Sequence, residues 1–143
     1  MSDGTIGFGT LLKVGDGGAP ETFTAIAEVA DISGPNLSHE PVQATHMQSP
    51  GAWHEYIKGL KDGGEITLDL TYLPGHATHD ASTGILKDFN DRTLRNFQMV
   101  FPDTGATTWN FAAFITAFEP AAPKDDRLAS AVTLKISGQP ALA

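Results

Sequence analysis

Residues 49–74 read SPGAWHEYIKGLKDGGEITLDLTYLP, and the second half of this stretch decides the fold. Side chains alternate between two sides from residue 65 onward, with Ile66, Leu68, Leu70 and Tyr72 on one side and Glu65, Thr67, Asp69 and Thr71 on the other. This period of two residues predicts a strand with one buried face. Asp62-Gly63-Gly64 comes immediately before it and contains residues that tolerate a positive φ, which predicts a tight turn into the strand.

The first half of the stretch is apolar without a clear period. Trp53, Tyr56, Ile57 and Leu60 are spaced i, i+3, i+4 and i+7, as on one face of a short helix. Glycines bracket the segment on both sides, so an ordered loop that buries its aromatic side chains is an equal alternative. A loop this apolar needs a cover, and a partner subunit is one candidate.

Further strands are predicted on both sides of this stretch. Apolar runs and alternation place them at residues 6–14, 23–32, 94–101, 109–118 and 129–137. The run at 109–118 is apolar on both faces, which predicts a strand covered on both, with another subunit as a candidate cover. Residues 120–127 are predicted to form an exposed loop.

One helix is predicted between these strands. Ile85, Leu86 and Phe89 fall on one helical face, and Asp80 or Ser82 precedes them as a candidate N-cap. Many short strands with a single helix indicate a mainly β fold, an antiparallel β-sandwich or barrel with one short flanking α-helix.

Residues 37–59 are predicted to form a long loop. They have no sustained period and contain Pro41, Pro50 and three of the five histidines. Connections of this length inside a compact domain are usually functional or disordered.

Composition narrows the class of protein. A chain of 143 residues with 41% hydrophobic residues forms one domain with a real core. The net charge of −8 disfavours binding to nucleic-acid backbone or to an anionic membrane. The absence of Cys excludes disulfides, thiolate catalysis and Cys-ligated zinc. An acidic start and the lack of an 18-residue apolar window predict a soluble protein without a membrane segment.

Few residues suggest a chemical site. His76, His79 and Asp80 could ligate a divalent metal, but they lie in a polar loop without a second set of ligands, so polar contacts with solvent or another subunit are the favoured interpretation. Asp62 with Glu65 would resemble a glycosidase pair, yet acids on the polar face of a strand are usually solvated. Motifs for a nucleophile elbow, a phosphate loop or an EF-hand are missing. We therefore predict no catalytic residue, metal or cofactor.

Five features in order carry a resemblance that covers nearly the whole chain. They are VADISGP at 29–35 with LS at 37–38, ATH at 44–46 followed by SPG at 49–51, YIKGLKDGGE at 56–65, FQMVFPD at 97–103 and TLKISG at 133–138. Together they make the sequence similar to the major tail tube proteins of long, flexible-tailed, lambda-like bacteriophages, a group with relatives in gene transfer agent tails. The GLKDGGE run is the most specific of them.

The resemblance implies a structural virion protein. It implies a β-sandwich whose copies form hexameric rings that stack into a hollow tube, with one sheet of each subunit joining a continuous barrel around the lumen. DNA would pass through without specific binding, and the other partners would be the tape-measure, tail tip and tail terminator proteins. The tube would be part of the virion tail and be assembled in the host cytoplasm.

The resemblance also assigns roles along the chain. Residues 1–143 would be a single tail tube domain, with a flexible arm at residues 1–5 and a long assembly loop at residues 37–59. Contacts between subunits or rings are expected at His46, Pro50, Trp53, Tyr56, Ile57 and Leu60. The alternative is a non-viral β-sandwich that binds a metal through His76, His79 and Asp80, or a carbohydrate through Trp53 and Tyr56.

Overall fold

The computed structural model describes residues 4–142, so part of the expected arm at residues 1–5 lies outside the described residues. The strands are β1 (Leu11–Gly15), β2 (Phe23–Ala25), β3 (Val29–Ser33), β4 (Ser38–Gln43), β5 (Tyr56–Asp62), β6 (Glu65–Thr71), β7 (Arg95–Val100), β8 (Thr108–Ala121) and β9 (Ala129–Leu142). A 3-10 turn spans Pro50–Ala52, and the single helix of the described residues is α1 (Ile85–Asp91). The prediction of a mainly β, antiparallel fold with one short helix is confirmed.

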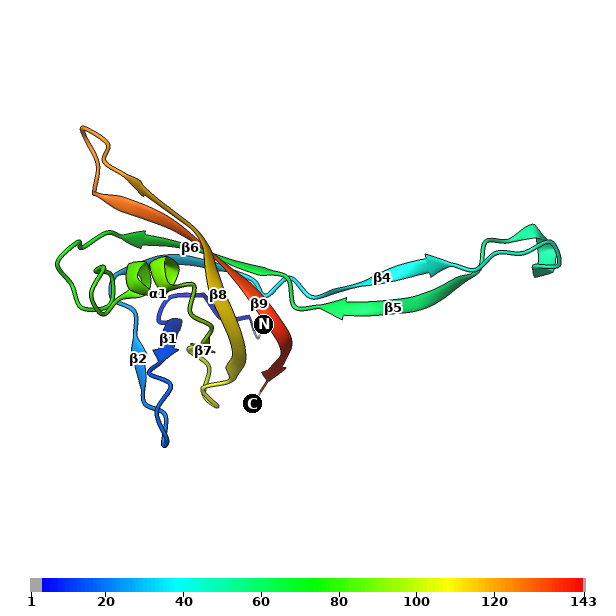
Figure 1. The fold of residues 1–143 in the computed structure, drawn as a ribbon, viewed down its shortest axis with the longest axis horizontal. Helices are drawn as coiled ribbons and strands as arrows, with labels where there is room; N and C mark the ends of the chain where they lie inside the picture. Colours follow the sequence, from blue (N-terminus) through cyan, green and yellow to red (C-terminus); the bar gives the residue numbers. More distant parts are fainter. Residues whose placement is uncertain (1–3, 143) are drawn as a thin grey trace.

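The strands form two sheets. One has seven strands in the order β2-β1-β7-β8-β9-β6-β3, and the other consists of β4 and β5 alone. Every neighbouring pair is antiparallel. Figure 1 shows that the seven-stranded sheet curves into a body, while the β4–β5 hairpin extends far away from it. We call these two parts the body and the hairpin.

The curvature of the large sheet encloses one core. Strands from both halves of the sheet contribute to a single buried cluster, in which Leu12 of β1 and Phe97 of β7 join Leu68 of β6 and Leu134 of β9. Ile85 at the start of α1 belongs to the same cluster. The sheet therefore buries one face against itself and against α1, as a sandwich or barrel does.

The central predicted strand is confirmed as β6. Ile66, Leu68 and Leu70 are each 0% exposed, and β9 pairs with β6 over seven residues, from Glu65↔Lys135 to Thr71↔Ala129. Val132, Leu134 and Ile136 of β9 are buried as the alternation predicts.

The N-terminal predictions need two corrections. The strand expected over residues 6–14 begins at Leu11, and Ile6 and Phe8 lie exposed before it. The strand expected over residues 23–32 is two strands, because the chain turns at Glu28 (φ 57). This turn carries the chain from β2 at one edge of the sheet to β3 at the other.

The later predictions differ mainly in their ends. The N-cap of α1 is Gly84, and Asp80 instead accepts hydrogen bonds from the backbone N–H groups of the turn before it, residues 82–84. Strand β8 continues into the predicted loop at 120–127, and β9 continues past Gly138. The outer face of β8 is partly open in the single chain, where Phe114 is 38% exposed.

Candidate assembly surface

The prediction of a long loop at residues 37–59 is wrong for most of this segment. Strands β4 and β5 pair over it, with Val42 opposite Ile57 and Gln43 opposite Tyr56. Every residue of β4 is exposed. A strand without a buried face needs no alternation of apolar and polar residues, so the sequence showed no period there.

The hairpin is fastened to the body at Asp62-Gly63-Gly64, which we call the joint. The N–H of Gly64 donates to Asp62 Oδ1 at 2.9 Å, and Lys135 Nζ of β9 donates to the same oxygen at 3.0 Å. The Gly64 amide, and then Lys135, lower the pKa of Asp62 below its ordinary value of 3.8. Gly64 has φ 75, and a Cβ there would lie 2.1 Å from the carbonyl oxygen of Asn36. The predicted tight turn is not formed, because residues 63 and 64 have no turn conformation and the chain runs on from β5 into β6 in much the same direction (Figure 1). The close approach to Asn36 still requires glycine at residue 64.

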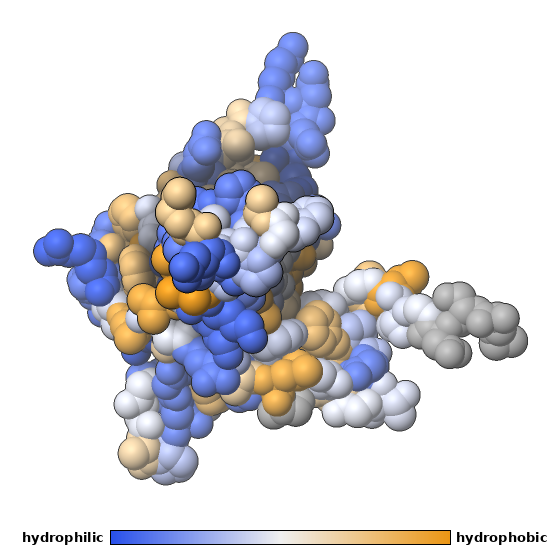
Figure 2. Space-filling view, turned by 90° about the vertical axis from the view of Figure 1, so that its right-hand side faces the viewer, coloured by the Kyte–Doolittle hydropathy of each residue, from blue (hydrophilic) through white to orange (hydrophobic). Residues whose placement is uncertain are grey.

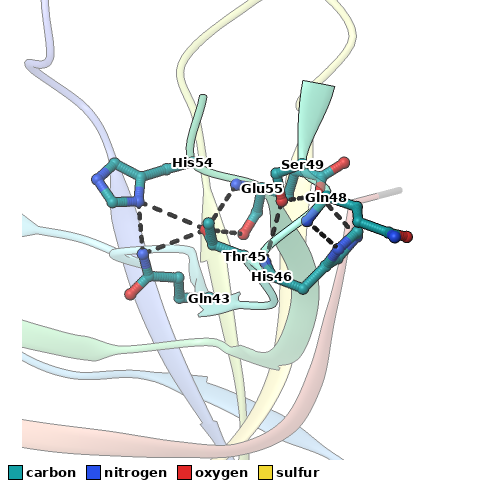
Figure 3. A network of polar contacts seen from close by, with 7 residues as sticks. All are labelled: Gln43, Thr45, His46, Gln48, Ser49, His54 and Glu55. Carbon is teal, nitrogen blue, oxygen red and sulfur yellow. Dashed lines mark hydrogen bonds and ion pairs between the residues drawn. The ribbon is translucent and has the colours of Figure 1, made fainter. Parts of the chain in front are cut away.

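The tip of the hairpin is folded by its own polar contacts. Figure 3 shows the network formed by Gln43, Thr45, His46, Gln48, Ser49, His54 and Glu55. The N–H of Glu55 donates to Thr45 Oγ1 at 2.9 Å, and the N–H of Ala44 donates to the Glu55 carbonyl at 2.8 Å. The Glu55 carboxylate accepts from the Ser49 hydroxyl and lies 3.3 Å from His46 Nε2. The tip is therefore held in shape while its apolar side chains stay exposed.

The structure brings the six expected contact residues together on the hairpin. His46, Pro50 and Trp53 belong to the tip, and Tyr56, Ile57 and Leu60 belong to β5. Trp53 is 76% exposed and Leu60 90% exposed, so neither the helix nor the loop that buries its aromatics is formed in the single chain.

Sequence reasoning missed three more large exposed apolar residues of this segment, and the first is Leu37, 54% exposed just before β4. Val42 on β4 is 43% exposed, and Met47 at the tip is fully exposed. Val42 can be recognised only from its pairing with Ile57, which the sequence does not reveal. Met47 lies in an irregular tip, where no periodic pattern indicates which side chains are exposed. Figure 2 views the molecule from the side toward which the hairpin points and shows hydrophobic residues exposed among hydrophilic ones. This surface can bury apolar area against another protein.

The expected metal ligands do not form a metal site. His79 was expected to face solvent or another subunit, but it is 0% exposed. Its Nδ1 accepts from the Leu73 N–H at 3.1 Å, and its Nε2 donates to the Ala27 carbonyl at 2.7 Å. Burial lowers the pKa of His79 below its ordinary value of 6.5, which favours this neutral form. Within residues 4–142, no three His, Asp or Glu side chains are grouped so that they could hold a metal ion.

The helix content was also compared with what a membrane span requires. In residues 4–142, no helix has both the length and the apolar character needed to cross a bilayer.

Solved structures with the same fold come from tail and injection particles. A chain in the tail of an empty gene transfer agent particle with C6 symmetry has a TM-score of 0.74 and 22% identity, covering 98% of this chain and 99% of that one. A chain of the extended sheath–tube complex of an extracellular contractile injection system has a TM-score of 0.69 and 16% identity, covering 100% and 93%. Identities this low establish the fold alone.

The family comparison reaches further than the fold. A search of curated proteins finds no match. The family described as "Lambda phage tail tube protein, TTP" matches residues 9–143, which is nearly the whole chain. This match supports a structural tail protein rather than a metal- or carbohydrate-binding module. The chain belongs to the lambda phage tail tube protein family and is a structural subunit of a tail tube.

Proposed function

We propose that copies of this chain form hexameric rings that stack into a hollow tube through which DNA passes. The sixfold order is supported by the C6 symmetry of the gene transfer agent tail whose chain shares this fold. Residues 1–143 act as one tail tube domain, and the particle is a phage virion or a gene transfer agent. The role is passive, without catalysis or a cofactor.

The exposed area of the single chain supports assembly and is the observation that carries the proposal. A folded monomer of 15.1 kDa exposes about 7,100 Å². This chain exposes 9466 Å², an excess of about 2,400 Å². Permanent complexes bury areas of roughly 2,000 Å² or more. The surplus surface matches what a subunit of a permanent assembly has to bury.

The hairpin provides the main contact between copies. A two-stranded ribbon is at best marginally stable in water, so this one gains stability when another protein covers it. We assign its exposed residues to contacts between subunits or rings, namely His46, Pro50, Trp53, Tyr56, Ile57 and Leu60.

The charge suits a conduit for DNA. With −8 per chain, a ring of several copies is strongly acidic and does not hold a nucleic-acid backbone. Tape-measure, tail tip and tail terminator proteins would be the remaining partners, in a virion tail assembled in the host cytoplasm.

Electron microscopy of the purified protein at low and high concentration tests the proposal. We expect rings or hollow tubes at high concentration. Replacing residues 41–56 with an Asn-Gly turn should leave a folded monomer that forms no tubes, because these residues contribute nothing to the core. A matched control deletes Lys124 and Asp125 from the exposed β8–β9 loop and should assemble. Tubes of normal length from the 41–56 variant would contradict the role of the hairpin.

A further inference from the structure

The hairpin is not a regular ladder. His39 pairs with Lys61 and Pro41 pairs with Lys58, so Gly59 and Leu60 together lie opposite the single residue Glu40. This arrangement is a β-bulge on β5. A Cβ on Gly59 would lie 3.2 Å from the Cβ of Glu40, which places both residues on the same face.

The bulge changes which side chains share a face. In a regular ladder starting from Ile57, Leu60 would fall on the side of Lys58, and Lys61 on the side of Ile57. The extra residue shifts this order by one. Lys61 therefore lies on the face of Lys58, and Leu60 lies beside Glu40 on the face of Ile57.

One face of the hairpin consequently gathers apolar side chains around the single carboxylate of Glu40, and we call it the apolar face. Val42, Ile57 and Leu60 lie on it, and they are 43%, 58% and 90% exposed. Three exposed branched side chains on one face of a ribbon gain free energy when a second surface covers them.

The opposite face is basic. It carries His39, Lys58 and Lys61, with Tyr56 at its outer end. Within residues 4–142, neither lysine forms an ion pair with an acid of its own chain. The chain has 9 basic residues, counting Lys and Arg, and 17 acidic residues. Residues 37–62 contain 2 of the basic and 3 of the acidic ones, so the rest of the chain has 7 basic and 14 acidic residues. The rest of every copy is therefore acidic and complements this face.

We propose that each hairpin is held between two other copies of this chain, with its apolar face buried against one copy and its basic face against an acidic surface of the other. The two faces of a ribbon point in opposite directions, so a single flat neighbour covers only one. The excess area of the free chain leaves surface to be covered, and the proposed tube makes further copies of this chain the occupants. The inference rests on the proposed function, and it adds that two contacts of different chemistry act on one hairpin.

Face-specific substitutions in the full chain test this inference. For the apolar face, Ile57→Thr is compared with Ile57→Val, because Thr and Val have the same shape and both favour strands. For the basic face, the double variant Lys58→Gln with Lys61→Gln is compared with Lys124→Gln in the exposed loop. The critical concentration for tube formation is measured by sedimentation and electron microscopy at low and high salt, with folding checked by circular dichroism.

Two distinct patterns are expected. Ile57→Thr raises the critical concentration roughly tenfold or more at every salt concentration, while Ile57→Val stays close to the unmodified protein. The double lysine variant raises it at low salt, and the difference shrinks at high salt because salt screens the charges. Lys124→Gln has no such effect.

The remaining outcomes separate the two proposals. If the unmodified protein forms tubes and either face tolerates its substitutions, the two-sided contact is wrong while the tube function stands. If the unmodified protein forms no tube at any concentration, the proposed function fails and this inference fails with it.

Discussion

The body and the hairpin both consist of antiparallel strands, but the body buries most of its apolar side chains and the hairpin exposes them. Leu68 in β6 is 0% exposed, whereas Leu60 in β5, the strand that precedes it along the chain, is 90% exposed. The body forms a closed core within one chain, although Phe114 on the outer face of β8 stays 38% exposed. The hairpin has no layer of its own to pack against, so its apolar residues add nothing to the core of the single chain and are the ones that we propose for contacts between copies.

The largest effect should come from the core of the body. Leu68→Ala should lower the free energy of unfolding of the monomer by about 2–5 kcal/mol, because it leaves a cavity in a closed core. Urea denaturation followed by circular dichroism measures this change. A loss below about 1 kcal/mol would mean that β6 is not packed as described.

The joint should come next, because it links the two regions. Gly64→Ala adds a Cβ that meets the Asn36 carbonyl, at a residue with positive φ. We expect a loss of about 2 kcal/mol, measured by the same denaturation. Gly105→Ala is the control, since its Cβ would meet nothing within 4 Å. Equal stability of both variants would show that the joint tolerates a side chain.

The body should also be the acid-sensitive region. His79 has a lowered pKa, so below its ordinary value of 6.5 the unfolded chain binds a proton that the folded chain resists. Its contribution to stability is complete above pH 6.5 and is lost as the pH falls through the lowered pKa. Asp62, Asp80 and Asp103 also have lowered pKa values, but their effect begins only near 3.8. In His79→Gln, the dependence of unfolding on pH just below 6.5 should flatten, and an unchanged slope would refute the assignment.

The smallest effect on the monomer should come from the hairpin. Leu60→Ala removes the same atoms as Leu68→Ala from a side chain that is already in water. We expect the free energy of unfolding to change by less than about 0.5 kcal/mol. A change as large as that of Leu68→Ala, measured in dilute monomer, would remove the distinction between the two regions.

The sequence predicted the body better than the hairpin, for a physical reason. Strands β6 and β9 bury one face, and burial imposes the alternation that a sequence reveals. In the hairpin both faces meet water in the single chain, Pro41 interrupts β4, and the bulge at Gly59 and Leu60 shifts the period by one residue. Its strands were therefore interpreted as a loop, although Trp53, Tyr56, Ile57 and Leu60 were already expected to make contacts with other copies.

Two further errors came from contacts that lie far apart along the chain. His79 appeared to be a polar loop residue because its partners, Ala27 and Leu73, are set only by the folded body. The run from Phe23 to Ile32 looked continuous because nothing local announces a turn at Glu28. No single-sequence pattern records such long-range geometry.

In the proposed tube, the joint determines how precisely the hairpin is oriented relative to the body. From Asp62 to Trp53 the hairpin spans at most about 30 Å, so a rotation of about 5° at the joint displaces the tip by about 2.6 Å. That displacement is comparable to the length of a hydrogen bond. The Gly64 amide and the Lys135 ammonium both donate to Asp62 and restrain the angle between the hairpin and the body. In the proposed tube, the rigidity of this joint determines how accurately the hairpin of one subunit reaches its contact on the next.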